Sequence, residues 1–327
     1  MTNQNRMESR PVLITGAAGF IGSHLVERVL AQGEPVVGID NFCDFYDPAR
    51  KRANLTAAKD HPQFTLYEMD FRDGPGIEAI VKRHHPRAVA HLGAYPSGRY
   101  SIGRAKLYTD VNIVGSINLL EAVRLEDVEV FVFASTSSIY GHTQQIPFVE
   151  TDACNHALSP YPASKKAIEV IGHTYYNLHH LNFTAVRFFN VYGPRSRPDM
   201  MPFLVTDRIV KGKTITLFNA GQLKRDWTYV DDIIDGLMAT LNRGVGYEIV
   251  NLGRGEPILM SDFVTTIEEL TGGKAKTETA PAPPSEPETT CANIEKFRTL
   301  FGYNPQTSVS DGLHQLWQWY KRDIMDV

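Results

Sequence analysis

The chain has few cysteines and no long hydrophobic run, and these absences exclude several classes of protein. Its three cysteines, Cys43, Cys154 and Cys291, lie far apart among 327 residues and lack metal-ligand spacing. A disulfide framework or a metal site is therefore not expected, and a reducing, cytoplasmic compartment fits best. No apolar stretch approaches the roughly 20 residues that a membrane helix requires, so we expect no membrane association.

The sequence also lacks an excess of basic residues. Its 33 lysines and arginines against 37 acidic residues give a net charge of −4. Proteins that bind nucleic acid through its phosphates are usually basic, so we expect no nucleic-acid partner. The composition, 43% hydrophobic and 21% charged, is close to that of globular proteins and excludes a disordered chain.

Short apolar runs alternate with helical patterns through the first 190 residues. The predicted strands are Val12–Thr15, Val36–Ile39, Phe64–Met69, Ala88–Leu92, Val130–Ala134 and Thr184–Phe188. The predicted helices between them include Leu25–Leu30, Ile77–Lys82, Thr109–Arg124 and Ala163–His179. This alternation is typical of βαβ units, so we expect an α/β fold: a doubly wound parallel sheet with helices on both faces.

The alternation breaks after Asn190, which indicates a second, smaller domain. The later predictions are helices at Phe203–Lys211 and Val230–Leu241, a strand at Tyr247–Leu252 and a last helix around Leu313–Tyr320. The stretch 277–290 is rich in Pro, Glu and Thr and is either a disordered linker or an extended crossing segment. We expect residues 1–190, with about 226–253, to form the first domain, and 191–225 with 254–327 to form the second.

A glycine motif points to a dinucleotide. Gly16, Gly19 and Gly22 follow a strand and open a helix, and Asp40 ends the next strand. Glycines let the backbone approach a pyrophosphate, which the helix N-terminus attracts. A carboxylate at Asp40 accepts ribose hydroxyls and repels a 2′-phosphate, which favours NAD over NADP. The alternative is a turn that only packs the helix on the strand.

Tyr161 and Lys165 stand four residues apart at the start of a helical segment, so they share a helix face. A lysine ammonium near a phenol favours the phenolate, which serves as a general base toward a sugar hydroxyl. Thr136 follows a predicted strand, at the end where parallel sheets place ligand-facing residues. The alternative for Thr136 is a polar turn.

These motifs, with Asp70 in MDFRD, Ala90-His-Leu-Gly-Ala94 and Asn112, resemble the extended short-chain dehydrogenase/reductase family and its nucleotide-sugar epimerases. The resemblance implies a Rossmann-type domain followed by a nucleotide-sugar-binding domain, with Thr136, Tyr161 and Lys165 as catalytic residues. It implies an NAD site built from Gly16, Gly19, Phe20, Ile21, Gly22, Asp40, Asn41, Asp70, Phe71, Leu92, Ala94, Asn112, Tyr161 and Lys165. It implies a UDP-sugar site built from Arg99, Thr136, Ser137, Ser138, Asn190, Arg197, Phe218 and Arg225.

A narrower similarity is to UDP-glucuronate 4-epimerases. It rests on the stretches 44–52, 193–200 and 218–229. The chain departs from that pattern at Asn190, where the family usually has Thr, and at 283–287, where Pro-Pro-Ser-Glu-Pro replaces Gln-Pro-Gly-Asp-Val. Neutral-sugar epimerases commonly carry Asn at the position of Asn190, so a UDP-glucose or UDP-N-acetylglucosamine 4-epimerase is the alternative.

Ser137 and Ser138 argue against neighbouring reactions, because sugar dehydratases of this family carry Asp-Glu there and decarboxylases tend to have Glu at position 138. We therefore predict 4-epimerisation of UDP-glucuronate to UDP-galacturonate through a 4-keto intermediate. Arg197 or Arg195, with Ser137 and Ser138, is expected to hold the carboxylate, and Arg197 is favoured because it begins the Arg-Pro-Asp-Met stretch that resembles the uronate epimerases. A non-catalytic NAD-sensing protein is disfavoured because the Tyr-Lys pair is kept. The family implies a homodimer, formed through segments near 100–124 and 161–180.

Overall fold

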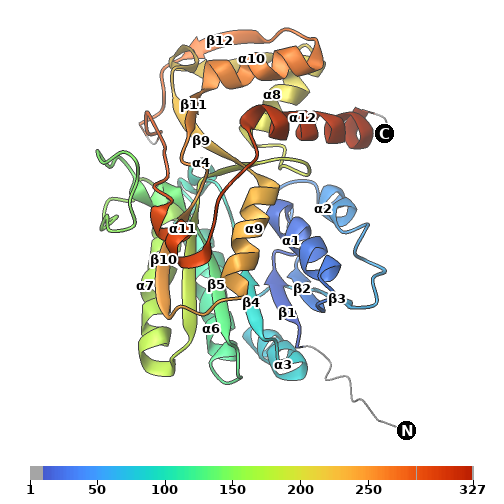
Figure 1. The fold of residues 1–327 in the computed structure, drawn as a ribbon, viewed down its shortest axis with the longest axis vertical. Coiled ribbons are helices and arrows are strands. Elements are labelled where there is room, and N and C mark those ends of the chain that lie inside the picture. The colour runs from blue at the N-terminus through green and yellow to red at the C-terminus, as the bar shows by residue number, and fades with distance from the viewer. Residues whose placement is uncertain (1–9, 285, 326–327) are drawn as a thin grey trace.

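The structure, a computed structural model, describes residues 10–284 and 286–325. A seven-stranded sheet lies at its centre, with all neighbouring strands parallel (Figure 1). In spatial order the strands are β10 (Tyr247–Leu252), β6 (Asn182–Phe188), β5 (Val130–Thr136), β4 (Ala88–His91), β1 (Val12–Thr15), β2 (Val36–Asp40) and β3 (Phe64–Glu68). The order reverses at β1, where doubly wound sheets bind their ligands.

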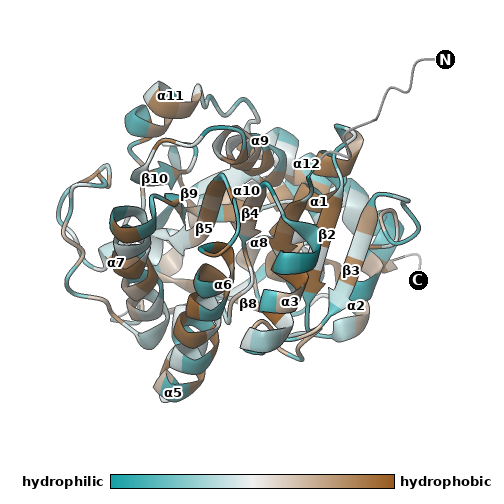
Figure 2. Cartoon of the chain, turned by 90° about the horizontal axis from the view of Figure 1, so that it is seen from below, coloured by the Kyte–Doolittle hydropathy of each residue, from teal (hydrophilic) through white to brown (hydrophobic). Residues whose placement is uncertain are grey.

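Helices cover both faces of this sheet because successive side chains of a strand point to opposite sides. Val12 and Ile14 pack with α1 (Phe20–Ala31) and α9 (Val230–Leu241). Leu13, between them, joins the cluster of the other face. The helices of that face are α3 (Gly74–His84), α6 (Gly115–Val123) and α7 (Pro160–His179). Figure 2 shows the hydrophobic strands between these two helical layers.

Most of the elements after residue 190 gather beyond the carboxyl ends of the strands (Figure 1). The strands there are β7 (Asn190–Tyr192), β9 (Lys224–Tyr229) and β11 (Pro257–Leu259) in one small sheet, and β8 (Thr214–Phe218) with β12 (Lys276–Ala280) in another. The larger helices there are α8 (Met201–Val210), α10 (Met260–Thr271) and α12 (Val309–Tyr320), while α11 (Glu295–Phe301) packs near β10. In the part of the chain that the structure describes, no helix has the length and hydrophobicity needed to span a membrane.

The predicted elements of the first 190 residues are all present, with modest shifts at their ends. The predicted helix 109–124 begins as a π-helix over Thr109–Val114 and continues as α6. The described part of the stretch 277–290 begins in β12, which pairs in parallel with β8, and ends at Glu288 and Thr290, whose backbone bonds that of Lys224. These segments agree with the extended interpretation and not with the linker one. Most side chains of β12 are exposed, which explains its polar composition.

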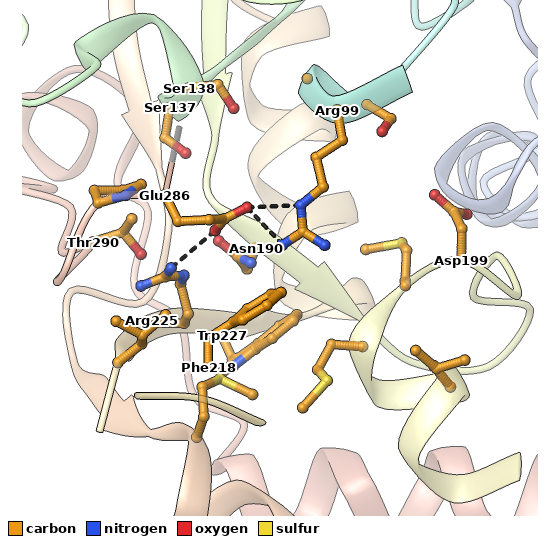
Figure 3. Close-up of a pocket in the computed structure, with 18 of the residues that line it drawn as sticks. Arg99, Ser137, Ser138, Asn190, Asp199, Phe218, Arg225, Trp227, Glu286 and Thr290 are labelled. Carbon is orange, nitrogen blue, oxygen red and sulfur yellow. Dashed lines mark hydrogen bonds and ion pairs between the residues drawn. The ribbon is translucent and has the colours of Figure 1, made fainter. Parts of the chain in front are cut away.

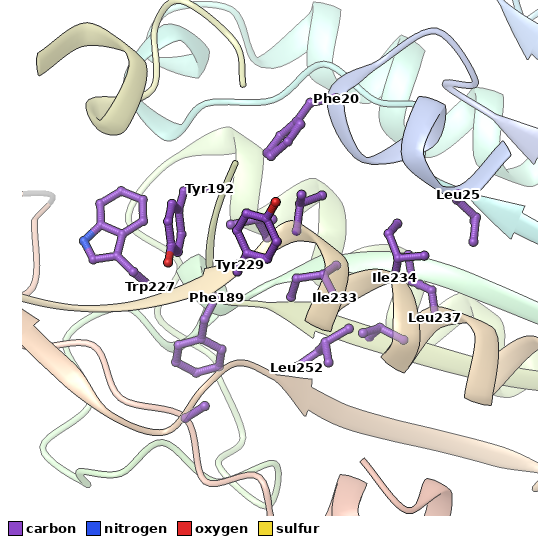
Figure 4. Packing of buried hydrophobic residues seen from close by; sticks show 14 of the residues in the cluster. Phe20, Leu25, Phe189, Tyr192, Trp227, Tyr229, Ile233, Ile234, Leu237 and Leu252 are labelled. Atoms are coloured by element: carbon purple, nitrogen blue, oxygen red, sulfur yellow. The ribbon is translucent and has the colours of Figure 1, made fainter. Parts of the chain in front are cut away.

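One hydrophobic cluster extends from the large sheet into the smaller ones (Figure 4). It contains Leu25 of α1 and Ile233 of α9, and it also contains Trp227, Phe263 and Leu313 beyond the sheet. The two predicted domains therefore share a continuous core. Their limits stay a prediction.

Candidate active site

A cavity of about 200 Å³ lies at the point where the strand order reverses. It is bounded by the first turn of α1, the ends of β1, β2 and β4, and the start of α7. Most residues predicted to hold the cofactor line this smaller cavity. They are Gly16, Gly19, Phe20, Ile21, Gly22, Asp40, Asn41, Phe71, Leu92, Ala94, Tyr161 and Lys165.

The glycines of the turn leave no room for side chains. Gly16 has φ +69°, and a Cβ atom there would lie 2.8 Å from the backbone nitrogen of Gly93. A Cβ atom on Gly22 would lie 2.0 Å from the carbonyl oxygen of Gly16. Helix α1 begins at Phe20 without a side-chain cap, so its first N–H groups are available at the cavity. This is the geometry that a pyrophosphate requires.

Asp40 adds the ribose-binding carboxylate. Its two oxygens accept hydrogen bonds from the backbone N–H groups of Ala18 (3.0 Å) and Phe42 (2.8 Å). Burial raises the pKa of Asp40, while the Lys51 charge and these two hydrogen bonds oppose the rise. Each carboxylate oxygen keeps a further lone pair for a ribose hydroxyl. The donors and acceptors of the smaller cavity thus fit NAD.

Two residues predicted for the cofactor site do not line the smaller cavity. Asp70 accepts hydrogen bonds from Arg72 (2.7 Å) and from Asn41 (2.9 Å), so it orients a residue that does line it. Asn112 is buried and bonds the backbone N–H of Tyr95 (2.8 Å) and the hydroxyl of Ser164 (3.0 Å). Asn112 therefore fixes a loop of the cavity wall to α7.

Thr136 and Tyr161 come together where β5 ends and α7 begins. Thr136 is the last residue of β5, and its hydroxyl accepts a hydrogen bond from the backbone of Ser138 (3.1 Å). Burial raises the pKa of Tyr161, and a hydrogen bond with Thr136 and the charge of Arg197 act to lower it. Tyr161 is thus half-buried, and Thr136 and Arg197 oppose the rise that burial causes in its pKa.

Lys165 lies one helical turn beyond Tyr161. It is 3% exposed, and its ammonium is 4.7 Å from the centre of the Phe133 ring. Burial lowers the pKa of Lys165 to about 7. The positive charge that acts on Tyr161 in this structure is that of Arg197, so the predicted effect of Lys165 on the phenol stays a prediction.

A larger cavity of about 630 Å³ adjoins the first and opens toward the smaller sheets (Figure 3). Predicted substrate residues line it: Arg99, Ser137, Ser138, Asn190, Arg197, Phe218 and Arg225. Thr136 lines neither cavity, although Ser137 and Ser138, the next two residues, line the larger one and Ser135 lines the smaller one. Sequence reasoning missed Trp227, which faces this cavity beside Phe218 (Figure 3).

Arg99 and Arg225 reach into the larger cavity from opposite walls and share one carboxylate (Figure 3). Glu286 accepts a hydrogen bond from Arg99 at 2.7 Å and from Arg225 at 3.0 Å. The two guanidinium groups are therefore arranged around a single anion. Sequence reasoning missed Glu286, although it is the acidic residue retained in the altered stretch 283–287.

The structure separates the two arginines left open by the sequence. Arg195 donates to Glu27 of α1 (2.7 Å) and lines neither cavity. Arg197 lines both cavities and pairs with Asp199 through its Nε (2.9 Å) and Nη2 (3.0 Å) atoms. Its Nη1 atom takes no part in that pair, so one edge of the guanidinium remains for a ligand.

A glycine turn at the reversal point of a parallel sheet, with a tyrosine in its cavity and a second cavity adjoining it at Arg197, defines a Rossmann-type enzyme that uses a dinucleotide on a small molecule. The profile of the NAD dependent epimerase/dehydratase family matches residues 12–253, and the chain belongs to this family. NAD is accordingly its cofactor, as the smaller cavity allows.

Individual relatives match nearly the whole chain. The UDP-glucuronate 4-epimerase of Thermodesulfobacterium geofontis is 39% identical over 95% of this chain and 96% of its own. UDP-glucuronic acid 4-epimerase from Bacillus cereus, solved with UDP-glucuronic acid and NAD, has a TM-score of 0.90 at 34% identity, covering 95% and 99% of the two chains. UDP-glucose 4-epimerase of Thermotoga maritima, solved with UDP-glucose, has a TM-score of 0.88 at 28% identity, covering 95% and 99%.

Proposed function

We propose that this protein is an NAD-dependent 4-epimerase that interconverts UDP-glucuronate and UDP-galacturonate. The observation that carries the proposal is the place of Arg197, which lines both cavities and acts on Tyr161. A guanidinium at this junction meets the carbon-5 carboxylate of a uronic acid whose carbon 4 faces Tyr161. The named relatives from Thermodesulfobacterium and Bacillus support the same substrate.

The larger cavity orients the nucleotide sugar. The diphosphate is expected to replace the Glu286 carboxylate between Arg99 and Arg225, because it carries more charge. Phe218, on the same side as Arg225, then offers its ring to the uracil. The sugar consequently extends toward Ser137, Ser138 and the junction with the smaller cavity.

Tyr161 and Thr136 carry out the proton transfer. NAD, when bound, supplies the group that takes the hydride from carbon 4 and later returns it. As the hydride leaves, the Tyr161 oxygen accepts the 4-hydroxyl proton, while Thr136 hydrogen-bonds the reacting oxygen. The resulting 4-keto sugar turns within the cavity and takes the hydride on its other face, and Tyr161 returns the proton.

A 4-keto uronate is a β-keto acid, so an epimerase must prevent loss of carbon dioxide. Arg197 holds the carboxylate away from the alignment that permits decarboxylation, with Ser137 and Ser138 as further donors. The two serines are poor acids and bases near neutral pH, which leaves proton transfer to Tyr161. The residues therefore suffice for epimerisation, and Ser137 and Ser138 supply neither an acid nor a base for dehydration.

The experiment that tests this function incubates the purified protein with UDP-glucuronate, UDP-glucose and UDP-N-acetylglucosamine, followed by chromatography. We expect UDP-galacturonate from the first substrate. In Arg197→Ala the loss corresponds to about 2–5 kcal/mol of binding with UDP-glucuronate and is small with a neutral sugar. Some UDP-pentose is also expected from this variant. Arg195→Ala is the matched control and should retain activity. Equal losses on charged and neutral sugars contradict the assignment of Arg197.

Asn190 supports a second candidate, a UDP-glucose or UDP-N-acetylglucosamine 4-epimerase. Asn190 lines the larger cavity, where its amide offers both a donor and an acceptor to a neutral hydroxymethyl group. The same assay decides between the two candidates. Conversion of UDP-glucose without conversion of UDP-glucuronate selects this one.

We further propose a homodimer that forms through the outer faces of α7 and of the helical segment near residues 100–124. These two segments pack together and expose Ile102 (58%), Val114 (45%) and Val170 (56%). Two copies of such an apolar face would form a four-helix contact. Light scattering should give the mass of a dimer, and Val170→Glu should give a monomer. A monomeric wild type contradicts the proposal.

We also propose a cytoplasmic location. All three cysteines are free thiols, and Cys154 and Cys291 are buried. Free cysteines persist where disulfide formation is disfavoured. Fractionation of the native host should recover the protein with cytoplasmic enzymes.

A further inference from the structure

A buried carboxylate on α7 takes no part in the chemistry described above. Glu169 and Arg187 are both 0% exposed and form a two-pronged ion pair, with Nε–Oε1 at 2.9 Å and Nη2–Oε2 at 2.8 Å. Ser135, which lines the smaller cavity, donates to the same Oε1 atom at 2.6 Å. One side chain of α7 is thus bonded to two adjacent strands.

The geometry of these contacts connects the ion pair to the catalytic residues. Ser135 and Arg187 are directly paired across β5 and β6, and Thr136 is the next residue along β5. On α7, Glu169 follows Lys165 by four residues and Tyr161 by eight, so the three side chains share one helix face. The hydroxyl of Tyr247 in β10 also donates to the Glu169 carbonyl oxygen at 2.9 Å.

Stability alone does not account for this arrangement. Burying two charges costs about as much as their attraction returns, and apolar replacements of such pairs are often neutral or stabilising. Here the cost is increased because Nη1 of Arg187 is buried and has no hydrogen-bond partner among the residues that the structure describes. A directional contact is retained where apolar packing would serve stability equally well.

We propose that Glu169 and Arg187 are positioning residues, which set the rotation and height of α7 so that Tyr161 meets Thr136 and Lys165 meets the cofactor. This inference rests on the proposed function. Apolar contacts set how closely α7 approaches the sheet, as at Gly172, where a Cβ atom would lie 2.4 Å from the Phe183 ring. Such contacts are non-directional and permit rotation. A displacement of about 1 Å at a reacting group costs as much as 10²-fold in rate.

The test separates positioning from stability by replacing the pair with apolar residues. In Glu169→Leu/Arg187→Met we expect a melting temperature near that of the wild type. We expect kcat to fall about 10–100-fold, KM for the UDP-sugar to stay within about threefold, and NAD to be lost on gel filtration. Arg187→Lys keeps the positive charge but only one of the two hydrogen bonds to Glu169, and should give an intermediate kcat. The control is Arg52→Met/Glu68→Leu, which removes an exposed bidentate pair (3.1 and 2.7 Å). This control should change neither kcat nor NAD retention.

A double variant with wild-type kcat and full NAD retention overturns the inference. If the double variant does not fold, the Arg187→Lys variant provides the test instead. A wild-type kcat in Arg187→Lys would also contradict the positioning role. A wild type that binds NAD but converts no UDP-sugar refutes the proposed function, and NAD retention in the variants then tests the positioning role by itself.

Discussion

The two cavities are built from different materials. The smaller one is formed by backbone at the ends of buried strands, and its defining residues, Gly16, Gly22 and Asp40, lie within 25 residues of each other. The larger one is formed by long side chains that come from segments far apart, such as Arg99, Arg225 and Glu286. The shape of a site made of backbone is fixed by the fold. The shape of a site made of long side chains depends on which charged groups pair within it.

This difference has a functional reason. The cofactor site must present the same dinucleotide in the same orientation in every turnover, and rigid backbone serves that purpose. The sugar site must accept a nucleotide, hold it by charge, and leave room for the keto intermediate to turn. Arg197 lines both cavities, and Tyr161 lines the smaller one beside it.

The largest expected effect lies at Tyr161. Tyr161→Phe keeps the ring but removes the oxygen that transfers the proton, so kcat should fall by about 10²–10⁴-fold. Because neither cavity changes shape, NAD content and UDP affinity should stay at wild-type values, as measured by dinucleotide assay and calorimetry. Tyr67→Phe, whose hydroxyl bonds His84 away from both cavities, is the control. Near-full activity of Tyr161→Phe refutes the mechanism.

A change in the backbone site should affect the cofactor alone. In Gly22→Ala the new methyl group would lie 2.0 Å from the Gly16 carbonyl oxygen and force the turn apart. We expect this variant to purify without NAD while UDP binding persists. Gly33→Ala changes a glycine of positive φ with no atoms within 4 Å, and should retain its NAD. Retention of NAD by Gly22→Ala would show that the turn is not the cofactor site.

The opposite selectivity is expected in the side-chain site. Arg225→Ala removes a charged hydrogen bond worth roughly 1.5–3 kcal/mol, or about 10–150-fold in UDP affinity. Uridine, which lacks phosphates, should bind both forms equally, and NAD content should not change. The comparison requires only calorimetry. A parallel loss of uridine affinity would place Arg225 at the nucleoside instead of the diphosphate.

The smallest expected effect is a pH dependence of stability. Lys165 has a pKa of about 7 when folded, against 10.5 for the ordinary side chain. Between these pH values the unfolded chain holds a proton that the folded one lacks, so the free energy of unfolding rises with pH, by at most about 1.4 kcal/mol per unit. In NAD-free protein, Lys165→Met should flatten this rise between about pH 7 and 9 in urea titrations. Exposed Lys106→Met should leave the slope unchanged, and an unchanged slope in Lys165→Met contradicts the assignment.

The sequence predicted the backbone site more completely than the side-chain site. The glycines and Asp40 are local in the chain and obey strict steric rules, so their pattern specifies both the turn and its ligand. By contrast, no local sequence pattern predicts that Glu286 lies between Arg99 and Arg225, because only the tertiary fold brings these segments together.

The choice between Arg195 and Arg197 shows the same limit. Both arginines stand in one loop, two residues apart, and the sequence assigns them equal chemistry. The structure distinguishes them by partner, because Glu27 of α1 holds Arg195 away from the cavities. Likewise, the polar strand β12 was ambiguous because its side chains are exposed and its only structural sign is pairing with β8.

The hydrophobic cluster that runs from Leu25 to Trp227 and Leu313 governs how the molecule melts. Because both parts contribute to this cluster, the sheet and the elements above it should unfold as one cooperative unit. Calorimetry should then show a single heat-absorption peak whose van't Hoff and calorimetric enthalpies agree. A hinge motion that separated the large sheet from the elements above it would expose this apolar surface to water at every turnover. The keto sugar must therefore reverse its face inside an enclosure whose walls stay together.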